Sequence, residues 1–162
     1  MDRATFTGRF GGVFEHSPWI AEAAFDAGLP AEPWSAEGLH AALVVAMRAG
    51  SEAQKRALIE AHPDLAGRLA QAGRLTAEST REQASAGLDL LSDAERARFT
   101  ALNEAYKAKF GLPFIMAVKG RSKEEILAAF EDRLRNDPAA EFQTALDQIE
   151  RIALLRLKEM LP

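Results

Sequence analysis

The stretch DPAAEFQTALDQIERIALLRLKEM, residues 137–160, decides the fold. Asp137 followed by Pro138 is typical of a helix start, because acidic and small polar residues cap helices and proline is favoured at the first helical position. Placed on a helical wheel, the stretch shows one apolar stripe. The stripe consists of Phe142, Leu146, Ile149, Ala153 and Met160. The stretch therefore predicts a long helix that packs one face against a core and runs nearly to the end of the chain.

Arg156 falls inside this apolar stripe. A guanidinium directed into a core costs several kcal/mol unless it is paired and fully hydrogen-bonded. Two interpretations follow from the pattern. Either Arg156 serves a pocket, or its stem is buried and its head reaches solvent near the chain end.

Cap signals divide the preceding chain into further helices in the same way. The predicted helices run from Ser17-Pro18 to Gly28, Ser35 to Gly50, Ser51 to about Ala61, His62 to Ala72, Thr76 or Ser79 to Gly87, Ser92 to Gly111, and Ser122 to about Arg135. The exception is Leu112 to Val118, where Pro113 precedes a short apolar run between two glycines, which favours a buried extended segment. We expect an all-α, single-domain helical bundle of about eight helices over residues 1–162, with one short extended segment near 112–118.

Composition excludes several classes of function. The net charge of −4 gives no support to nucleic-acid or membrane-surface binding. The absence of cysteine excludes disulfides, thiolate nucleophiles and sulfur-ligated zinc. No signal peptide and no apolar run of membrane-spanning length are present, so we expect a soluble, cytoplasmic protein.

His62 stands in front of Pro63 and Asp64, which suit the first two positions of a new helix. Histidine is a poor N-cap, and a histidine held by a rigid proline is well placed to exchange a proton near neutral pH. The simpler alternative is a surface histidine at a helix start. The two other histidines, His16 and His40, share no ligand spacing with His62, so we expect them to be structural and predict no metal site.

Ser79-x-x-Glu82 has the form of a capping box, which indicates a structural role as readily as a functional one. On pattern alone both interpretations stay open.

Several motifs in order resemble one known family. They are Phe10 to Ile20, the His-Pro-Asp-Leu and Ser-x-x-Glu-Gln motifs between His62 and Leu88, Leu102-Asn103-x-x-Tyr106, Phe110-Gly111-x-Pro113-Phe114-Ile115, and Ile152 to Leu157. Together they resemble the OHCU decarboxylase family. Its members are cofactor-free enzymes of urate breakdown that decarboxylate 2-oxo-4-hydroxy-4-carboxy-5-ureidoimidazoline to (S)-allantoin.

The resemblance implies a site. It assigns catalysis to His62, Glu82 and Arg156, with His62 as acid/base, Glu82 accepting hydrogen bonds from ureido or ring N–H groups, and Arg156 suited to a ureido carbonyl or a carboxylate. Substrate-binding residues would be Pro63, Ser79, Gln83, Phe114, Ile115, Met116 and Ala117. The resemblance implies a small-molecule substrate and no cofactor. Alternatives are a decarboxylase of a related ureido acid and a non-catalytic helical binding module.

Three leucines of the last helix, Leu154, Leu155 and Leu157, lie away from the apolar stripe and need other cover. The N-terminal helices or a second subunit could supply it. Because contiguous exposed apolar patches usually mark an interface, the sequence favours a homodimer over a monomer.

Overall fold

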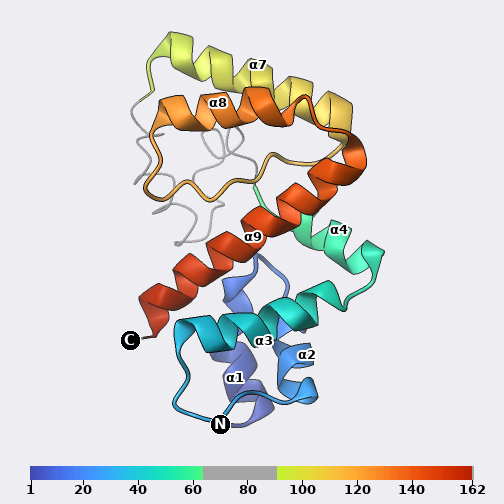
Figure 1. Cartoon of the computed structure of the whole chain (residues 1–162), viewed down its shortest axis with the longest axis vertical. Helices are drawn as coiled ribbons and strands as arrows, with labels where there is room; N and C mark the ends of the chain where they lie inside the picture. The colour runs from blue at the N-terminus through green and yellow to red at the C-terminus, as the bar shows by residue number, and fades with distance from the viewer. Residues whose placement is uncertain (64–90, 162) are drawn as a thin grey trace. The chain divides into compact units, whose positions relative to one another are not determined.

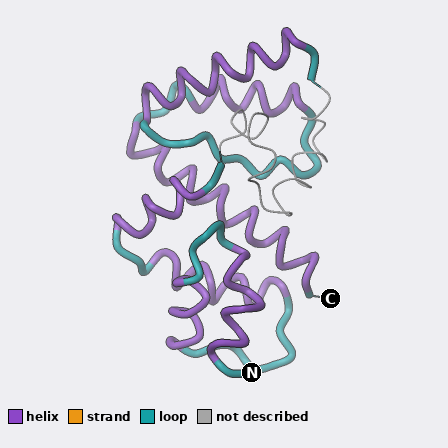
Figure 2. The backbone as a smooth tube through the Cα atoms, turned by 180° about the vertical axis from the view of Figure 1, so that it is seen from behind, coloured by secondary structure: helices purple, strands orange, loops and turns teal. Residues whose placement is uncertain are grey.

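A computed structural model of the chain describes residues 1–63 and 91–161 and divides the chain into two compact units. The first unit comprises Met1–His62 and Ile149–Pro162, and the second comprises Pro63–Gln148. The described residues form seven α-helices and one 3-10 turn, with no strand among them (Figures 1 and 2). The all-α class is confirmed. Two predicted helices lie outside the described residues: the one from His62 to Ala72, beyond Pro63, and the one from Thr76 or Ser79 to Gly87.

The first unit begins with a helix that the cap signals did not reveal. Helix α1 (Arg3–Phe10) is capped by Asp2, whose carboxylate accepts a hydrogen bond from the Thr5 N–H at 2.7 Å. Only Phe6 and Phe10, one turn apart, mark its buried face. An eight-residue helix with two apolar residues and an internal glycine, Gly8, lacks the sustained periodicity that predicts a helix.

The other helices of the first unit are α2 (Trp19–Ala27), α3 (Ala36–Arg48) and α4 (Glu52–Ala61), and the 3-10 turn η1 (Gly11–Val13) follows α1. Ser35 caps α3 as predicted, and Ser51 with Gln54 forms the predicted capping box of α4. The prediction for α2 is wrong by one residue. Pro18 occupies the N-cap position, and the hydroxyl of Ser17 donates instead to the Glu15 carbonyl at 2.9 Å.

The second unit contains α7 (Asp93–Phe110) and α8 (Lys123–Arg133), each opened by the predicted capping box, at Ser92 and Ser122. Gly111 ends α7 in the left-handed conformation, with φ of 65°, a geometry that glycine adopts without steric cost. Residues 112–118 then run extended and are almost wholly buried, as predicted. Helix α8 ends at Arg133, two residues before the predicted end.

The last helix, α9 (Pro138–Met160), has residues in both units. Asp137 caps it by accepting a hydrogen bond from the Ala140 N–H at 2.8 Å. Of the predicted stripe, Leu146, Ile149 and Ala153 are buried, whereas Phe142 is half-buried and Met160 is 38% exposed. The buried set also includes Ala145, Ile152, Arg156 and Leu157. The helix therefore buries a wider face than a single stripe, and this face ends before the last turn.

The burial of α9 bears on the leucines that suggested a second subunit. Leu157 is fully buried and Leu154 and Leu155 are half-buried in the single chain. Among the described residues, the large apolar side chains that are exposed are Met1, Val45 and Met160. The three leucines thus find cover within the chain and do not themselves form an exposed patch. None of the described helices combines the length and hydropathy that a membrane span requires.

Candidate functional site

Arg156 lies on the buried face of α9, with only 4% of its side chain exposed. Its Nη2 donates to Oε1 of Glu15 at 2.9 Å, and its Nη1 donates to the Val13 carbonyl at 3.2 Å. The interpretation in which the guanidinium reaches solvent is therefore wrong. A buried arginine is tolerated because a carboxylate and a carbonyl accept its hydrogen bonds.

Glu15 is a site residue that the sequence pattern did not predict. It is 1% exposed and lies between η1 and α2, in the motif Phe10 to Ile20. The sequence held one signal of this burial: the carboxylate of Glu15 directly follows the apolar pair Val13-Phe14. Charged residues are rarely fully buried unless they are paired, so a buried Glu15 needs a partner. That signal marks Glu15 as unusual but does not name its partner, which lies 141 positions away.

His62 belongs to the first unit, as Arg156 does, and is only 3% exposed. The alternative of a surface histidine is therefore wrong. His62 is the C-cap residue of α4, and its Nδ1 lies 2.8 Å from the Leu58 carbonyl. That carbonyl is among the last four of the helix, which lack partners within the helix. The helix expected to begin at Pro63 falls outside the described residues.

The contact with Leu58 determines the tautomer of His62. A carbonyl oxygen only accepts hydrogen bonds, so Nδ1 carries the hydrogen. In the neutral ring, Nε2 then holds the lone pair that can take up a proton. The backbone thus fixes both the orientation of the ring and the nitrogen that would act as base.

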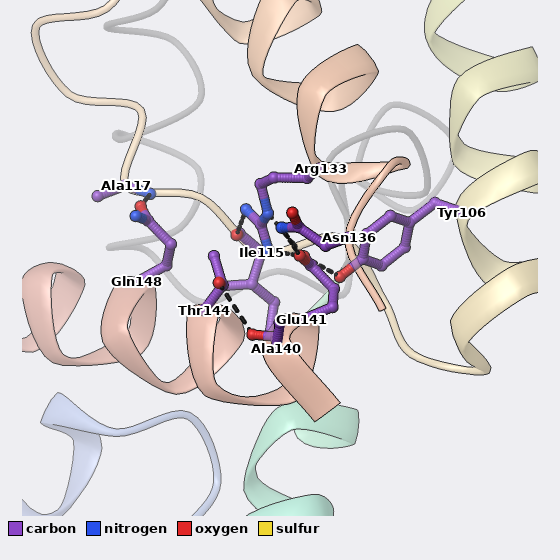
Figure 3. A network of polar contacts seen from close by, with 9 residues as sticks. All are labelled: Tyr106, Ile115, Ala117, Arg133, Asn136, Ala140, Glu141, Thr144 and Gln148. Carbon is purple, nitrogen blue, oxygen red and sulfur yellow. Dashed lines mark hydrogen bonds and ion pairs between the residues drawn. The ribbon is translucent and has the colours of Figure 1, made fainter. Parts of the chain in front are cut away.

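In the second unit, the extended segment contains four of the predicted substrate-binding residues, Phe114, Ile115, Met116 and Ala117, all of them buried. Two side chains hold its backbone (Figure 3). Arg133 Nη1 donates to the Ile115 carbonyl at 2.5 Å, and Gln148 Oε1 accepts from the Ala117 N–H at 3.0 Å. The segment is therefore held at Ile115 and Ala117, two of the four residues that the resemblance assigns to substrate.

Arg133 is held in turn by Glu141, which is fully buried. Glu141 accepts hydrogen bonds from Arg133 Nε at 2.6 Å, from the Tyr106 hydroxyl at 2.5 Å and from Asn136 Nδ2 at 3.0 Å (Figure 3). Burial raises the pKa of Tyr106 above its usual range, and the hydrogen bond to Glu141 adds to the rise. Tyr106 therefore stays a neutral donor at physiological pH. In the sequence, Tyr106 stands out only as part of a motif, and no local pattern indicates this network.

The remaining predicted site residues are described only in part. Pro63 is half-buried directly after His62. Ser79, Glu82 and Gln83 lie outside the described residues, so the choice between a capping box and a ligand contact stays open for Ser79 and Glu82. Of the two other histidines, His40 contacts the Glu150 carbonyl through Nε2 at 2.8 Å, and His16 is exposed. Within residues 1–63 and 91–161, no group of three or more histidine or acidic side chains could hold a metal ion.

The first unit also has an apolar groove of about 550 Å³ formed by α2, α3 and the start of α4. Six alanines and two glycines line it together with Trp19, Val45 and Gln54. Gly50 is required there because a Cβ at this position would lie 2.7 Å from the Trp19 ring. None of the lining residues is charged or can act as an acid or base at neutral pH, so the groove does not compete with His62 and Arg156 as a catalytic site.

Comparison with known proteins decides the family. The model of the family described as OHCU decarboxylase matches residues 1–158. The chain belongs to the OHCU decarboxylase family. Among its relatives, the 2-oxo-4-hydroxy-4-carboxy-5-ureidoimidazoline decarboxylase of Halalkalicoccus jeotgali is 42% identical over 160 residues, covering 98% of this chain and 86% of the relative.

Two solved structures of similar proteins support this assignment at the level of the fold. A crystal structure of (S)-allantoin synthase superposes with a TM-score of 0.78 at 35% identity, covering 99% of this chain. This chain spans only 51% of that protein. A crystal structure of OHCU decarboxylase in the presence of (S)-allantoin gives a TM-score of 0.65 at 20% identity, covering 88% of this chain and 89% of the other, and shows a shared fold. The resemblance of the motifs to the OHCU decarboxylase family is thus confirmed.

Proposed function

We propose that this protein catalyses the cofactor-independent decarboxylation of 2-oxo-4-hydroxy-4-carboxy-5-ureidoimidazoline to (S)-allantoin in urate degradation, as a carboxy-lyase of a single family domain that spans the chain. Membership of the OHCU decarboxylase family over residues 1–158 supports the proposal. The observation that carries it to a site is the burial of His62 and Arg156 in the same unit, because both belong to family motifs and together supply an acid/base group and a cation away from bulk water.

The substrate supplies its own electron sink. Its carboxylate is attached to a carbon that also carries a hydroxyl and neighbours a ring C=N bond. When the C–C bond to the carboxylate breaks, CO₂ leaves and the bonding electrons move toward the imine nitrogen, which takes up a proton, and this gives an enol-like intermediate. Transfer of the hydroxyl proton away from oxygen and delivery of a proton to the neighbouring carbon then yield allantoin. This flow of electrons needs no pyridoxal phosphate or similar group.

In this proposal His62 exchanges protons with the substrate hydroxyl or with the intermediate, through Nε2, because Nδ1 is committed to the Leu58 carbonyl. Glu82 and Arg156 orient the ureido group and ring, so that one face of the intermediate is presented for protonation. The resemblance also assigns substrate contacts to Pro63, Ser79, Gln83 and the segment Phe114 to Ala117. The backbone of that segment is already held in place by Arg133 and Gln148.

The experiment that tests the proposal is direct. Freshly oxidised urate serves as the source of substrate. The release of CO₂ and the formation of (S)-allantoin are then followed with and without the protein. We expect both to accelerate, with the S enantiomer dominating. An unchanged rate would reject the activity. Acceleration with a related ureido acid, but not with this substrate, would favour the alternative decarboxylase.

Three accompanying predictions concern metal dependence, location and assembly. We expect turnover to survive exhaustive dialysis against chelator, the protein to be cytoplasmic, and a homodimer to form. Light scattering that gives the mass of one chain, 17.6 kDa, over a wide concentration range would reject the dimer.

A further inference from the structure

The extended segment Phe114 to Ala117 is held differently at its two ends. At its start, the Phe114 ring stacks on Phe130, with ring centroids 3.6 Å apart, and the Arg133 guanidinium lies 4.3 Å from the centre of the Phe114 ring. Arg133 also donates to the Ile115 carbonyl and is bound in turn by Glu141. This end of the segment therefore belongs to the buried network around Glu141.

The Ala117 end depends on a contact of its backbone. Ala117 has only a methyl group as its side chain, so side-chain packing can do little to fix it. Residues 112–117 form no backbone-to-backbone hydrogen bond within the described part of the chain. The Ala117 N–H donates instead to Oε1 of Gln148, at 3.0 Å, and both residues lie in the second unit (Figure 3). Gln148 thus satisfies a backbone donor that a neighbouring strand would satisfy in a sheet.

The chemistry of the segment makes its position important. Its four side chains, those of Phe114, Ile115, Met116 and Ala117, cannot exchange protons. The resemblance to the family assigns them to substrate, where they can contribute shape and the exclusion of water. The planar carbon of the enol-like intermediate must receive its proton on one face to give (S)-allantoin. Water that reaches the other face delivers a proton there, while the hydroxyl proton leaves to solvent, and the R product forms.

We propose that Gln148 is a positioning residue of the decarboxylation. By holding the Ala117 N–H, it keeps the apolar segment where the segment excludes water from one face of the intermediate. The proposal rests on the proposed function, and Gln148 acts through the segment without reacting itself. Loss of its hydrogen bond leaves the stacking of Phe114 on Phe130 in place, so the Ala117 end shifts while the core of the unit persists.

The first test measures the contact itself, in the protein without ligand. Hydrogen exchange of the Ala117 amide is followed by NMR in the wild type, Gln148→Met and Gln148→Glu. Methionine keeps the length of the side chain but removes the strong acceptor, whereas the glutamate carboxylate retains one. We expect exchange about fivefold faster in Gln148→Met, a factor that matches the net free energy of one hydrogen bond. Exchange in Gln148→Glu should be no faster than in the wild type.

The second test measures the consequence for the reaction. The readouts are kcat and the enantiomeric excess of the allantoin, corrected for the uncatalysed reaction. We expect Gln148→Met to lose enantiomeric excess and to lower kcat about tenfold, because small displacements of positioning groups cost up to about a hundredfold in rate. Gln148→Glu should keep the wild-type enantiomeric excess. A merely structural role would reduce the amount of folded protein and leave the enantiomeric excess unchanged.

The matched control is Thr144→Val on the same helix. Thr144 Oγ1 donates to the Ala140 carbonyl at 3.0 Å, a hydrogen bond that begins and ends within α9 (Figure 3). Its loss should change neither the exchange of the Ala117 amide nor the enantiomeric excess.

Three results would overturn the proposal. They are a wild-type Ala117 amide that exchanges as fast as in an unstructured peptide, a folded Gln148→Met with wild-type enantiomeric excess, and an equal loss of enantiomeric excess in Gln148→Glu. If Gln148→Met does not fold, Gln148→Leu, which also lacks an acceptor, takes its place. Failure of the proposed function is distinguishable, because it appears as no CO₂ release by the wild type, whereas amide exchange is measured without turnover.

Discussion

The two units each bury an arginine–glutamate pair, and the surroundings of the two pairs differ. In the second unit, Arg133 and Glu141 are 8 positions apart. Both oxygens of Glu141 accept hydrogen bonds, and Arg133 continues to a backbone carbonyl (Figure 3). In the first unit, the pair of Arg156 and Glu15 joins residues 141 positions apart. The resemblance to the family assigns Arg156, but not Arg133, to the substrate site, and this assignment is a prediction.

The comparison shows that burial of a charge does not by itself identify a functional residue. The network of the second unit holds a backbone segment, and its loss should appear mainly as lost stability. The pair of the first unit lies with His62 in the unit to which we assign the acid/base chemistry, and its loss should appear mainly as lost activity. The predictions below test this division of roles.

The largest expected effect is that of His62→Asn. Loss of a general acid–base group lowers rates by about a hundred- to ten-thousand-fold. The asparagine amide retains an N–H donor for the Leu58 carbonyl, so the free energy of unfolding should change by no more than about 1–2 kcal/mol. Steady-state CO₂ release and urea denaturation measure the two quantities.

The matched control for this change is His40→Asn, because His40 also contacts a backbone carbonyl, that of Glu150, but is not assigned to the site. It should keep near-normal turnover. Near-normal turnover of His62→Asn as well would make His62 a structural C-cap residue and would refute the assignment of chemistry to this unit.

Glu141→Ala should cause the largest loss of stability. It leaves Arg133 buried without its carboxylate, and breaking a buried pair in this way costs about 3–5 kcal/mol. Urea denaturation measures the loss. The control is Glu131→Ala, which breaks the exposed pair with Arg98 and should cost about 0–1 kcal/mol. Equal losses for the two variants would mean that the network does not hold the second unit together.

Arg156→Met should be destabilising, and the destabilisation should depend on Glu15. Methionine has a similar volume and needs no partner, but the change leaves Glu15 buried beside an apolar side chain. Adding Glu15→Gln should recover about 1–3 kcal/mol, the size of coupling expected for residues in contact. Activity should be lost in both variants. A double variant as unstable as the sum of the single changes would show that the two residues are not coupled.

The smallest expected effect is alkaline destabilisation through Tyr106. Because burial and Glu141 raise its pKa, the folded chain keeps the phenolic proton above pH 10, where the unfolded chain loses it. This contribution to stability is fully present below about pH 10 and falls by up to about 1.4 kcal/mol per pH unit above it.

Tyr106 is the sole tyrosine of the chain, so absorbance at 295 nm reports its ionisation alone. In Tyr106→Phe, the unfolding free energy should fall less steeply between pH 10 and 11 than in the wild type, at a cost of about 1 kcal/mol at neutral pH for the lost hydrogen bond. The same slope in both proteins would contradict the raised pKa.

The sequence by itself determined most of the local structure of the described chain. The capping boxes at Ser51, Ser92 and Ser122 form as predicted, and the extended stretch after Gly111 lies where Pro113 and the apolar run place it. These features close their hydrogen bonds within three or four residues, so the pattern that encodes them is contiguous. Motif order also revealed the family, because motifs keep their order along the chain.

Only the tertiary structure decided which charges are buried and what they bind. With 20 basic and 24 acidic side chains, no local pattern could select Glu15 for Arg156 or Glu141 for Arg133. Helix α1 was missed for a related reason, because its two phenylalanines become recognisable as a buried face only when packed. Whether a charged group survives burial depends on partners that the fold brings from distant positions, and their geometry is a property of the packed chain and not of any segment.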